Sequence, residues 1–302
     1  MSEARAQLEE RLRERPMVLD GATGTELERL GARMSLPLWS ATALWECPEL
    51  LTGVHRAYAE AGVDLLTANT FRTHRRSLEA SGRGPQAREL TRRAVQLARR
   101  AAEVLGERAP RVLGSAAPLE DCYRPDLVPD AAALAAEHAA HVENLLEAGV
   151  DALLFETLNS VREARAATRA ARDAEAPFLV AFVCGADAQL LSGEPLEAAL
   201  EAVLPQAPLA VAVNCLPAFA VDACLPALRD CGCPFGVYAN LGAPDDSTGF
   251  RRSEETKPND FARHVGRWLE AGARLVGGCC GTTPAHLRAV VAEVRGQATR
   301  RR

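Results

Sequence analysis

Lysine is almost absent from this chain of 302 residues, and the only one, Lys257, lies in the polar stretch RRSEETKPND. Enzymes that form a Schiff base need a lysine whose amine is desolvated, so the sequence disfavours a lysine-dependent aldolase or lyase. Histidine offers no better candidates, because none of the six ends an apolar run. Four of them fall in stretches of helical character and are not expected to bind a metal: His55, His138, His141 and His264.

Long apolar runs and basic stripes are also missing. The opening MSEARAQLEERLRERP is charged and has no apolar stretch, so we do not expect a signal peptide. No run approaches the roughly 20 apolar residues of a membrane span. The formal net charge is −5 and neither half of the chain is basic, which disfavours nucleic acid as a partner. We therefore expect a cytoplasmic protein whose partners are small molecules.

Cysteine, by contrast, is plentiful. The chain has nine cysteines, an odd number, and no secretory signal. In a reducing compartment, metal binding or catalysis is the better interpretation of such thiols than disulfide bonding.

Short apolar runs recur along the whole chain and alternate with Ala/Glu/Arg/Leu-rich stretches of helical character. The runs span residues 17–22, 65–71, 112–117, 152–159, 178–184, 209–215, 235–240 and 274–280. Most lack polar alternation, as expected of strands buried on both faces in a parallel sheet. Eight such units in about 300 residues predict an α/β protein with a single (β/α)8 TIM barrel. No linker divides the chain, so residues 1–302 are interpreted as one domain with its core at about 16–297.

Active sites of such barrels lie at the carboxyl ends of the strands. The polar residues that close the runs are Asp20, Asn69, Thr70, Glu156, Asn214, Cys215, Asn240, Cys279 and Cys280. They are therefore expected to share one mouth. For Asn69 and Asn240 it stays open whether they line a site or only brace a loop.

Three of these residues are thiols that could share one metal ion. The ends of the sixth and eighth strands are about 10 Å apart, which two inward-reaching cysteines can bridge with Zn–S bonds of about 2.3 Å. Cys279 and Cys280 can both serve one ion only if the strand stops there, and Gly277, Gly278 and Gly281 are expected to give the backbone that freedom. Thr283 and Pro284 are predicted to begin the next helix.

Three protein ligands leave a fourth tetrahedral position open, which is typical of a catalytic zinc site. Three thiolates outweigh the two charges of zinc, so the centre is a poor Lewis acid for water but suits a bound substrate thiolate. The sequence thus indicates alkyl transfer to sulfur, with Cys215, Cys279 and Cys280 as both metal ligands and catalytic residues.

The other six cysteines receive plainer interpretations. Cys47, Cys122, Cys184 and Cys224 are taken as small core residues. Cys231 and Cys233 precede a strand, so they are expected at the opposite, amino-terminal end of the barrel.

Five segments together resemble the zinc-dependent homocysteine S-methyltransferase family: LDGATGTELERLG, HRAYAEAGVDLLTANTF, LLFETLNS, VAVNC and GGCCGTTPAHLRAV. They run from about position 18 to 290. The resemblance implies zinc held by Cys215, Cys279 and Cys280. It also implies that Asp20 and Glu156 bind the ammonium group of homocysteine, and that the backbone around Gly21 and the ends of the second and third strands hold its carboxylate. The loops LEDCYRPD, SGEPLEAAL and YANLGAPDD depart from many relatives and border the donor side.

For the methyl donor we favour a methylsulfonium compound, S-methylmethionine first and S-adenosylmethionine second, because a sulfonium methyl needs no second cofactor. An aromatic face would stabilise such a cation, and the candidates are Trp39, Trp45, Tyr123 and Tyr238. Folate use would call for cobalamin on further domains. Betaine users carry a carboxyl-terminal extension, whereas here only RGQATRRR is expected after the last helix. These two donors stay as alternatives, as does a zinc- or thiol-sensing barrel without turnover, which would not need an ammonium clamp.

Overall fold

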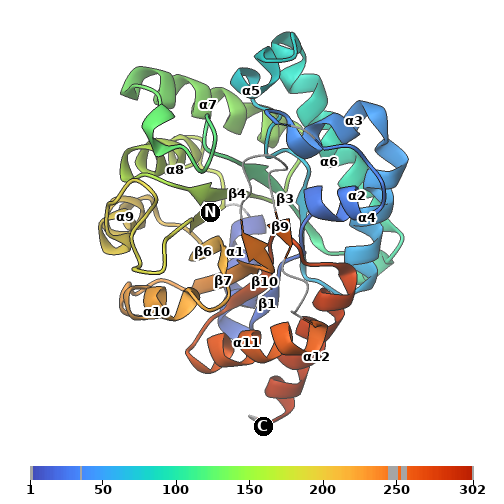
Figure 1. The fold of residues 1–302 in the computed structure, drawn as a ribbon, viewed down its shortest axis with the longest axis vertical. Helices are drawn as coiled ribbons and strands as arrows, with labels where there is room; N and C mark the ends of the chain where they lie inside the picture. Colours follow the sequence, from blue (N-terminus) through green and yellow to red (C-terminus); the bar gives the residue numbers. More distant parts are fainter. Residues whose placement is uncertain (1–2, 35, 244–250, 253–256, 301–302) are drawn as a thin grey trace.

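Eight short parallel strands close into a ring, as the apolar runs predict (Figure 1). The computed structural model describes residues 3–34, 36–243, 251–252 and 257–300. The strands of the ring are β1 (Met17–Val18), β2 (Leu65–Ala68), β3 (Arg111–Ala116), β4 (Ala152–Leu158), β5 (Phe178–Phe182), β6 (Ala210–Pro217), β7 (Phe235–Asn240) and β10 (Leu275–Gly278). They pair in the order β1-β10-β7-β6-β5-β4-β3-β2, and a parallel bridge between Leu19 and Leu65 joins the first strand to the second. The (β/α)8 barrel is therefore confirmed.

Helices surround this ring and follow the strands in turn (Figure 1). In the described part of the chain they are α1 (Glu3–Glu14), α2 (Gly24–Arg29), α3 (Ala43–Glu46), α4 (Pro48–Glu60), α5 (Arg75–Glu79), α6 (Ala87–Glu103), α7 (Ala131–Glu147), α8 (Val161–Asp173), α9 (Leu196–Val203), α10 (Val221–Asp230), α11 (Pro258–Glu270) and α12 (Pro284–Arg300). None of them is long and apolar enough to cross a bilayer.

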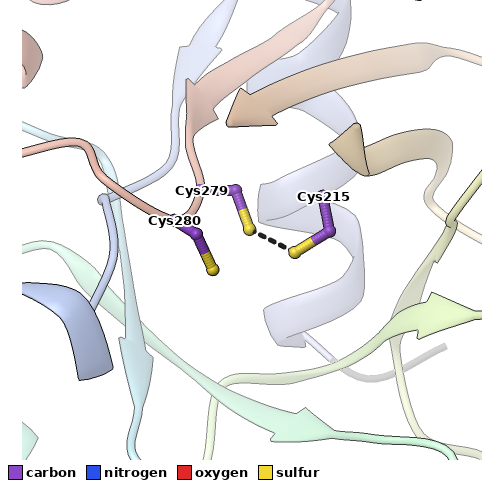
Figure 2. A group of neighbouring side chains, drawn as sticks. All are labelled: Cys215, Cys279 and Cys280. Carbon is purple, nitrogen blue, oxygen red and sulfur yellow. Dashed lines mark hydrogen bonds between the residues drawn. The ribbon is translucent and has the colours of Figure 1, made fainter. Parts of the chain in front are cut away.

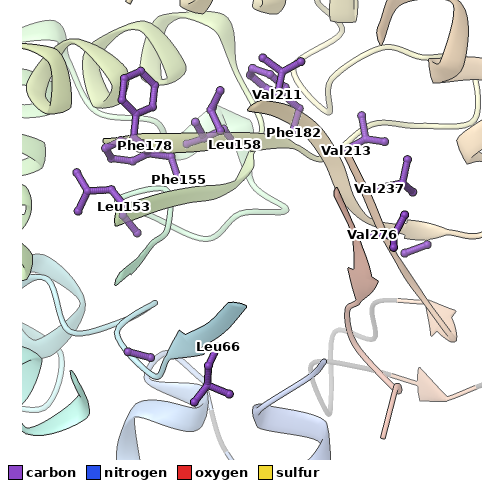
Figure 3. Packing of buried hydrophobic residues seen from close by; sticks show 14 of the residues in the cluster. Leu66, Leu153, Phe155, Leu158, Phe178, Phe182, Val211, Val213, Val237 and Val276 are labelled. Carbon is purple, nitrogen blue, oxygen red and sulfur yellow. The ribbon is translucent and has the colours of Figure 1, made fainter. Parts of the chain in front are cut away.

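Side chains on each strand alternate between two cores, as the period of a strand requires. In β4, Leu154 belongs to the core inside the ring, whereas Leu153 and Phe155 belong to the larger core between strands and helices. Figure 3 shows part of that outer core, with residues of β4, β5, β6, β7 and β10 side by side. Burial of both faces explains why the runs lack polar alternation.

Helix α1 is a feature that sequence reasoning missed. Its Leu8 and Leu12, one helical turn apart, are almost fully buried in the inner core. The guanidinium of Arg274, just before β10, donates to the carbonyl of Leu12 at 2.6 Å, and Arg5 donates to Ala207 at 2.8 Å. Since Ala207 and Arg274 precede strands, α1 covers the amino-terminal end of the barrel and leaves the other end for chemistry.

The carboxyl-terminal helix is longer than expected. The prediction that RGQATRRR follows the last helix was wrong, because α12 continues to Arg300. Gln297 is buried and its amide donates to the carbonyl of Gly266 in α11 at 3.0 Å. Packing against α11 thus extends the helix past Gly296, whose intrinsic helix propensity is about 1 kcal/mol poorer than that of alanine. A short antiparallel pair, β8 (Gly242–Ala243) and β9 (Arg251–Arg252), was also not anticipated.

Candidate functional site

Three thiols from two strand ends meet at the carboxyl end of the barrel. Cys215 lies in β6, and Cys279 and Cys280 follow β10 directly. The three sulfur atoms all lie within 4.8 Å of one another, and those of Cys215 and Cys279 are 2.6 Å apart. Figure 2 shows the side chains pointing toward a common centre. Among the described residues, no other group of histidine, cysteine or acidic side chains is arranged to hold a metal ion.

The backbone leaves regular β geometry where these thiols converge. Strand β10 ends at Gly278, so Cys279 and Cys280 are freed from strand alternation. Gly281 has φ +87° and makes the turn, as expected, but the other two glycines serve a different purpose. A Cβ on Gly277 would meet Leu19 of the first βα segment, and one on Gly278 would collide with Thr282. These glycines therefore provide space rather than conformational freedom.

Thr282 fastens the double-cysteine loop to the end of β1. Its hydroxyl accepts from the amide of Ala22 at 3.2 Å and donates to the carbonyl of Cys279 at 2.8 Å. The buried hydroxyl of Tyr58 lies between the carbonyls of Ala22 and Thr282, at 2.8 and 3.1 Å. Gly21 must lack a side chain, because a Cβ there would stand 2.7 Å from the Thr282 hydroxyl oxygen. The DGA and GGCCGTTP motifs are thus one packed unit.

Pro284 begins α12 as predicted, but Thr283 caps it differently from the expected way. The hydroxyl of Thr283 bonds to Nδ1 of His286 at 2.9 Å, and the same ring nitrogen accepts from the Thr283 amide at 3.3 Å. The histidine ring therefore satisfies an amide at the helix start.

Two carboxyl groups, of the buried Asp20 and the half-buried Glu156, lie at the same end of the barrel. Asp20 accepts from the amide and the hydroxyl of Thr67 in β2, at 2.8 and 2.7 Å. Burial raises the pKa of Asp20 from 3.8 to about 8, and the neighbouring Glu156 adds to the rise. Burial likewise raises the pKa of Glu156 from 4.5 to about 7, against a hydrogen bond from the hydroxyl of Ser115. A nearby cation would stabilise the ionised form of both carboxyl groups, and the ammonium group of a ligand has the right charge for this.

Asn214 braces the two strands that carry Glu156 and Cys215. Its Oδ1 accepts from the amide of Thr157 at 3.0 Å, and its Nδ2 donates to the Thr157 hydroxyl at 2.9 Å. Thr157 and Cys215 have φ of 61° and 55°, and the strand register shifts at both places. Left-handed backbone is strained for such residues and persists only where the surroundings impose it. One carboxamide therefore fixes two strained points beside a carboxyl group and a thiol.

The negative charge of one thiolate disfavours ionisation of the thiols beside it. The hydrogen-bonded Cys279 and burial hold the pKa of Cys215 well above its usual value. A divalent cation among the three sulfurs would reverse this, because coordination deprotonates a thiol. A set of three soft sulfur donors selects zinc, copper(I) or an iron–sulfur cluster over magnesium or calcium. The donor set thus fits a zinc ion.

Two of the aromatic candidates, Tyr238 and Tyr123, have pKa values that burial raises and the thiols raise further. Tyr123 is the one that lies outside the strands. It follows β3 in the LEDCYRPD loop, and its pKa rises through burial and then through Cys215, Cys122, Cys280 and Cys279. Two others are engaged elsewhere: Arg83 lies 4.5 Å above the ring of Trp45, and the Trp39 indole stands where a Cβ of Gly24 would be.

Tyr238 and Asn240, both on β7, are buried, and their side-chain polar atoms lack hydrogen-bond partners among the described residues. The Tyr238 hydroxyl is close enough to Glu156 to affect its pKa, yet it makes no hydrogen bond of ordinary geometry with any described residue. The carboxamide of Asn240 is also unpaired within the described ranges. Asn69, in contrast, exchanges two hydrogen bonds with Ser40, so it braces a loop.

The remaining cysteines and histidines lie outside the cluster. Cys184 and Cys224 are buried core residues, Cys47 is partly buried, and Cys231 and Cys233 lie before β7 at the amino-terminal end. Cys122 is buried as predicted, but beside the site, because its charge affects Cys215 and Cys280. The four histidines expected in helices are found there: His55 in α4, His138 and His141 in α7, and His264 in α11.

Sequence reasoning missed several positions that shape the site: Thr25, Tyr58, Thr67, Ser115, Thr157 and Thr282. The hydroxyl of Thr25, for example, accepts from the amide of Gly281 at 2.9 Å. Thr25, Tyr58 and Thr282 lie within the motifs DGATGTEL, HRAYAEAG and GGCCGTTP, so their motifs were a signal. Their bonding partners are distant in sequence and gave none.

Comparison with known proteins agrees with this geometry. A family model described as homocysteine S-methyltransferase matches residues 17–294. The homocysteine S-methyltransferase of Escherichia coli (strain K12) is 35% identical, over 91% of this chain and 94% of that protein. The selenocysteine methyltransferase of Astragalus bisulcatus is 29% identical, over 91% of each chain.

A solved structure is similar over almost the full length. The metallated form of the homocysteine methyltransferase MmuM from Escherichia coli has a TM-score of 0.82 and 30% sequence identity to this chain, covering 96% of this chain and 99% of that one. Residues 17–294, which the family model matches, include the three thiols and the carboxyl groups of Asp20 and Glu156.

The raised carboxyl pKa values predict how stability depends on pH. Asp20 and Glu156 hold their protons in the folded state up to about pH 8 and 7, whereas their usual values are 3.8 and 4.5. Rising pH therefore favours the unfolded chain, by up to about 1.4 kcal/mol per pH unit for each carboxyl. With chelator and reductant present, the free energy of unfolding should fall between about pH 4 and 8, measured by urea denaturation. Asp20→Asn and Glu156→Gln should each flatten the slope, and unchanged slopes in both would contradict the assignment.

The Asn214 brace predicts a matched pair of variants at Thr157. Thr157→Val keeps the β-branched shape but removes the hydroxyl that accepts from the Asn214 amide, leaving a buried donor unpaired. We expect it to lower the free energy of unfolding by about 1–3 kcal/mol. Thr157→Ser keeps the hydroxyl and should lose distinctly less. Equal stability of the valine variant and the wild type would show that the brace contributes nothing.

Proposed function

The chain belongs to the homocysteine S-methyltransferase family, and from that premise we propose that it transfers a methyl group from a methylsulfonium donor to the zinc-bound thiolate of homocysteine, giving methionine. It is a methyltransferase. The observation that supports the finer proposal is the meeting, at one end of the barrel, of three thiols with the buried Asp20 and the half-buried Glu156.

The three thiols would hold the metal. Cys215, Cys279 and Cys280 offer three sulfur donors from two strand ends. When bound, zinc would keep the homocysteine sulfur deprotonated and nucleophilic at neutral pH. The protein's own part is to supply thiolates in a buried setting and to leave room for the substrate sulfur.

The carboxyl groups would hold the other end of homocysteine. Asp20 is almost fully buried and Glu156 is partly buried. Hydrogen bonds from Thr67 and Ser115 fix the orientation of their carboxyl groups. An ammonium ion between them would return both to the charged form by direct pairing. The backbone around Gly21 would help to hold the homocysteine carboxylate. Homocysteine would then bind by both ends, with its sulfur toward the thiols.

The reaction itself is a nucleophilic displacement. The homocysteine sulfur forms a bond to the methyl carbon while the bond from that carbon to the sulfonium sulfur breaks. The donor leaves as a neutral thioether and keeps the electron pair of the broken bond. With S-methylmethionine both products are methionine. Tyr123, whose pKa the thiols raise, would place a π-face against the cationic donor.

We place this activity in the cytoplasm. All nine cysteines are free, which suits a reducing compartment and a site built from thiolates.

Zinc binding provides the first test of the proposal. Purified protein should hold about one zinc per chain, and Cys279→Ala should lose most of it, because a two-thiolate site has lower affinity. Cys233→Ala removes a thiol outside the cluster and is the matched control, with zinc content expected to be normal. Full zinc occupancy in the Cys279 variant, measured by metal analysis after dialysis against a mild chelator, would contradict the ligand assignment.

Donor choice provides the second test. Zinc-loaded protein with homocysteine should form methionine from S-methylmethionine, and more slowly from S-adenosylmethionine, without cobalamin. Betaine and methyltetrahydrofolate should be poor donors. Methionine should be quantified with homocysteine labelled in its carbon chain, so that the product from the acceptor is counted. Turnover with betaine or a folate alone would refute the sulfonium assignment, and no turnover with any donor would favour a sensing role.

A further inference from the structure

Arg72 is a buried cation with no hydrogen-bond acceptor or anionic partner in the described part of the chain. It lies in the segment that follows β2, on the same end of the barrel as the thiols, and is only 8% exposed. Within the described residues it forms no hydrogen bond or ion pair, and its guanidinium carbon lies 5.7 Å from the ring centre of Phe71. The nearby Arg75 and Arg76, in contrast, pair with Glu79 at 3.0 Å and with Glu120 at 2.9 Å.

Such a side chain is expected to have an anionic ligand. A guanidinium carries five N–H donors in a planar fork and keeps its charge at every physiological pH. Burying it without acceptors is unfavourable, and the ring of Phe71 beneath it gives those donors no ordinary hydrogen-bond acceptor. The shape of the fork matches a carboxylate, which it can bind through two parallel hydrogen bonds.

The surroundings of Arg72 place it on one side of the mouth. Its charge lowers the pKa of Cys122, although burial raises that pKa overall to about 12. Cys122 in turn raises the pKa of Cys215 and Cys280, and the thiols raise the pKa of the next residue, Tyr123. Arg76, four residues further on, pairs with Glu120 of the LEDCYRPD loop at 2.9 Å, so the segment that carries Arg72 lies against that loop. The guanidinium is therefore on the side of the mouth that carries Cys122 and Tyr123.

We propose that Arg72 binds a carboxylate of the methyl donor, so that the enzyme selects onium compounds that carry one. This inference rests on the proposed function and deepens it. In homocysteine the carboxylate is bonded to the carbon that bears the ammonium group, so its partner should lie next to Asp20 and Glu156. A donor lying along Tyr123 has its methyl group near the thiols and its carboxylate a few bonds away, toward Arg72.

The test compares two donors that differ only in the carboxylate. S-methylmethionine and (3-aminopropyl)dimethylsulfonium share the amine and the sulfonium group. Zinc-loaded wild type should bind S-methylmethionine roughly 30-fold or more tightly, measured by isothermal titration calorimetry, because loss of one partner of a buried charge pair has that effect. Arg72→Gln should abolish the preference, Arg72→Lys should keep part of it, and the exposed control Arg75→Gln should keep it fully.

A second arm identifies the source of the carboxylate. Homocysteine and 3-aminopropanethiol form the matching pair of acceptors, with and without the carboxylate. Arg72→Gln should leave the ratio of their kcat/KM values unchanged. If the variant instead erases discrimination between the acceptors and not between the donors, Arg72 serves homocysteine and the proposal is overturned.

The calorimetric arm does not depend on turnover. Absence of methionine with every donor would refute the proposed function, whereas a carboxylate preference that depends on Arg72 would still support the inference. If wild type binds the two sulfonium compounds equally, or binds neither, the inference is overturned whatever the assays show. Should Arg72→Gln fail to fold, judged by circular dichroism and zinc content, the wild-type comparison and Arg72→Lys decide the question.

Discussion

Convergence of three sulfur atoms on one point is the constraint on which the rest of the site depends. Regular strands would send Cys279 and Cys280 to opposite faces, so β10 has to stop at Gly278 and turn at Gly281. On the other side, Cys215 reaches the point only from a left-handed backbone at a register shift. The strain at Cys215 needs support from neighbours, which Asn214 supplies by bonding the equally strained Thr157.

Carboxyl and thiol groups lie together at the same end of the barrel without cationic partners among the described residues. Asp20 and Glu156 have raised pKa values, and the thiols raise one another's. In a buried setting each set becomes stable in its ionised form only when a cation arrives. A dication for the thiols and an ammonium for the carboxyl groups would meet both needs. Arg72 presents the opposite case, a buried cation with no anionic partner among the described residues. Under the proposed function, zinc, the acceptor and the donor would together supply the missing counter-charges.

Much of this arrangement was readable from the chain because it depends on local pattern. Continuous apolar runs locate all eight strands, and the polar residues that end them locate the thiols and the carboxyl groups. What sequence could not supply are contacts between distant segments. The burial of Leu8 in the barrel end, the bond from Asn214 to Thr157 and the isolation of Arg72 all depend on side chains far apart in the chain. The spatial role of Gly277 and Gly278 likewise depends on Leu19 and Thr282.

The central claim is that the acceptor sulfur binds directly to the metal held by Cys215, Cys279 and Cys280. Zinc K-edge X-ray absorption on protein loaded with selenohomocysteine measures this most directly, because selenium scatters differently from sulfur. The account predicts three sulfur neighbours and one selenium neighbour at the zinc, and three sulfur neighbours without selenium before the ligand is added. A spectrum with no selenium shell at saturating ligand, or a zinc bound by fewer than three sulfurs, would contradict it.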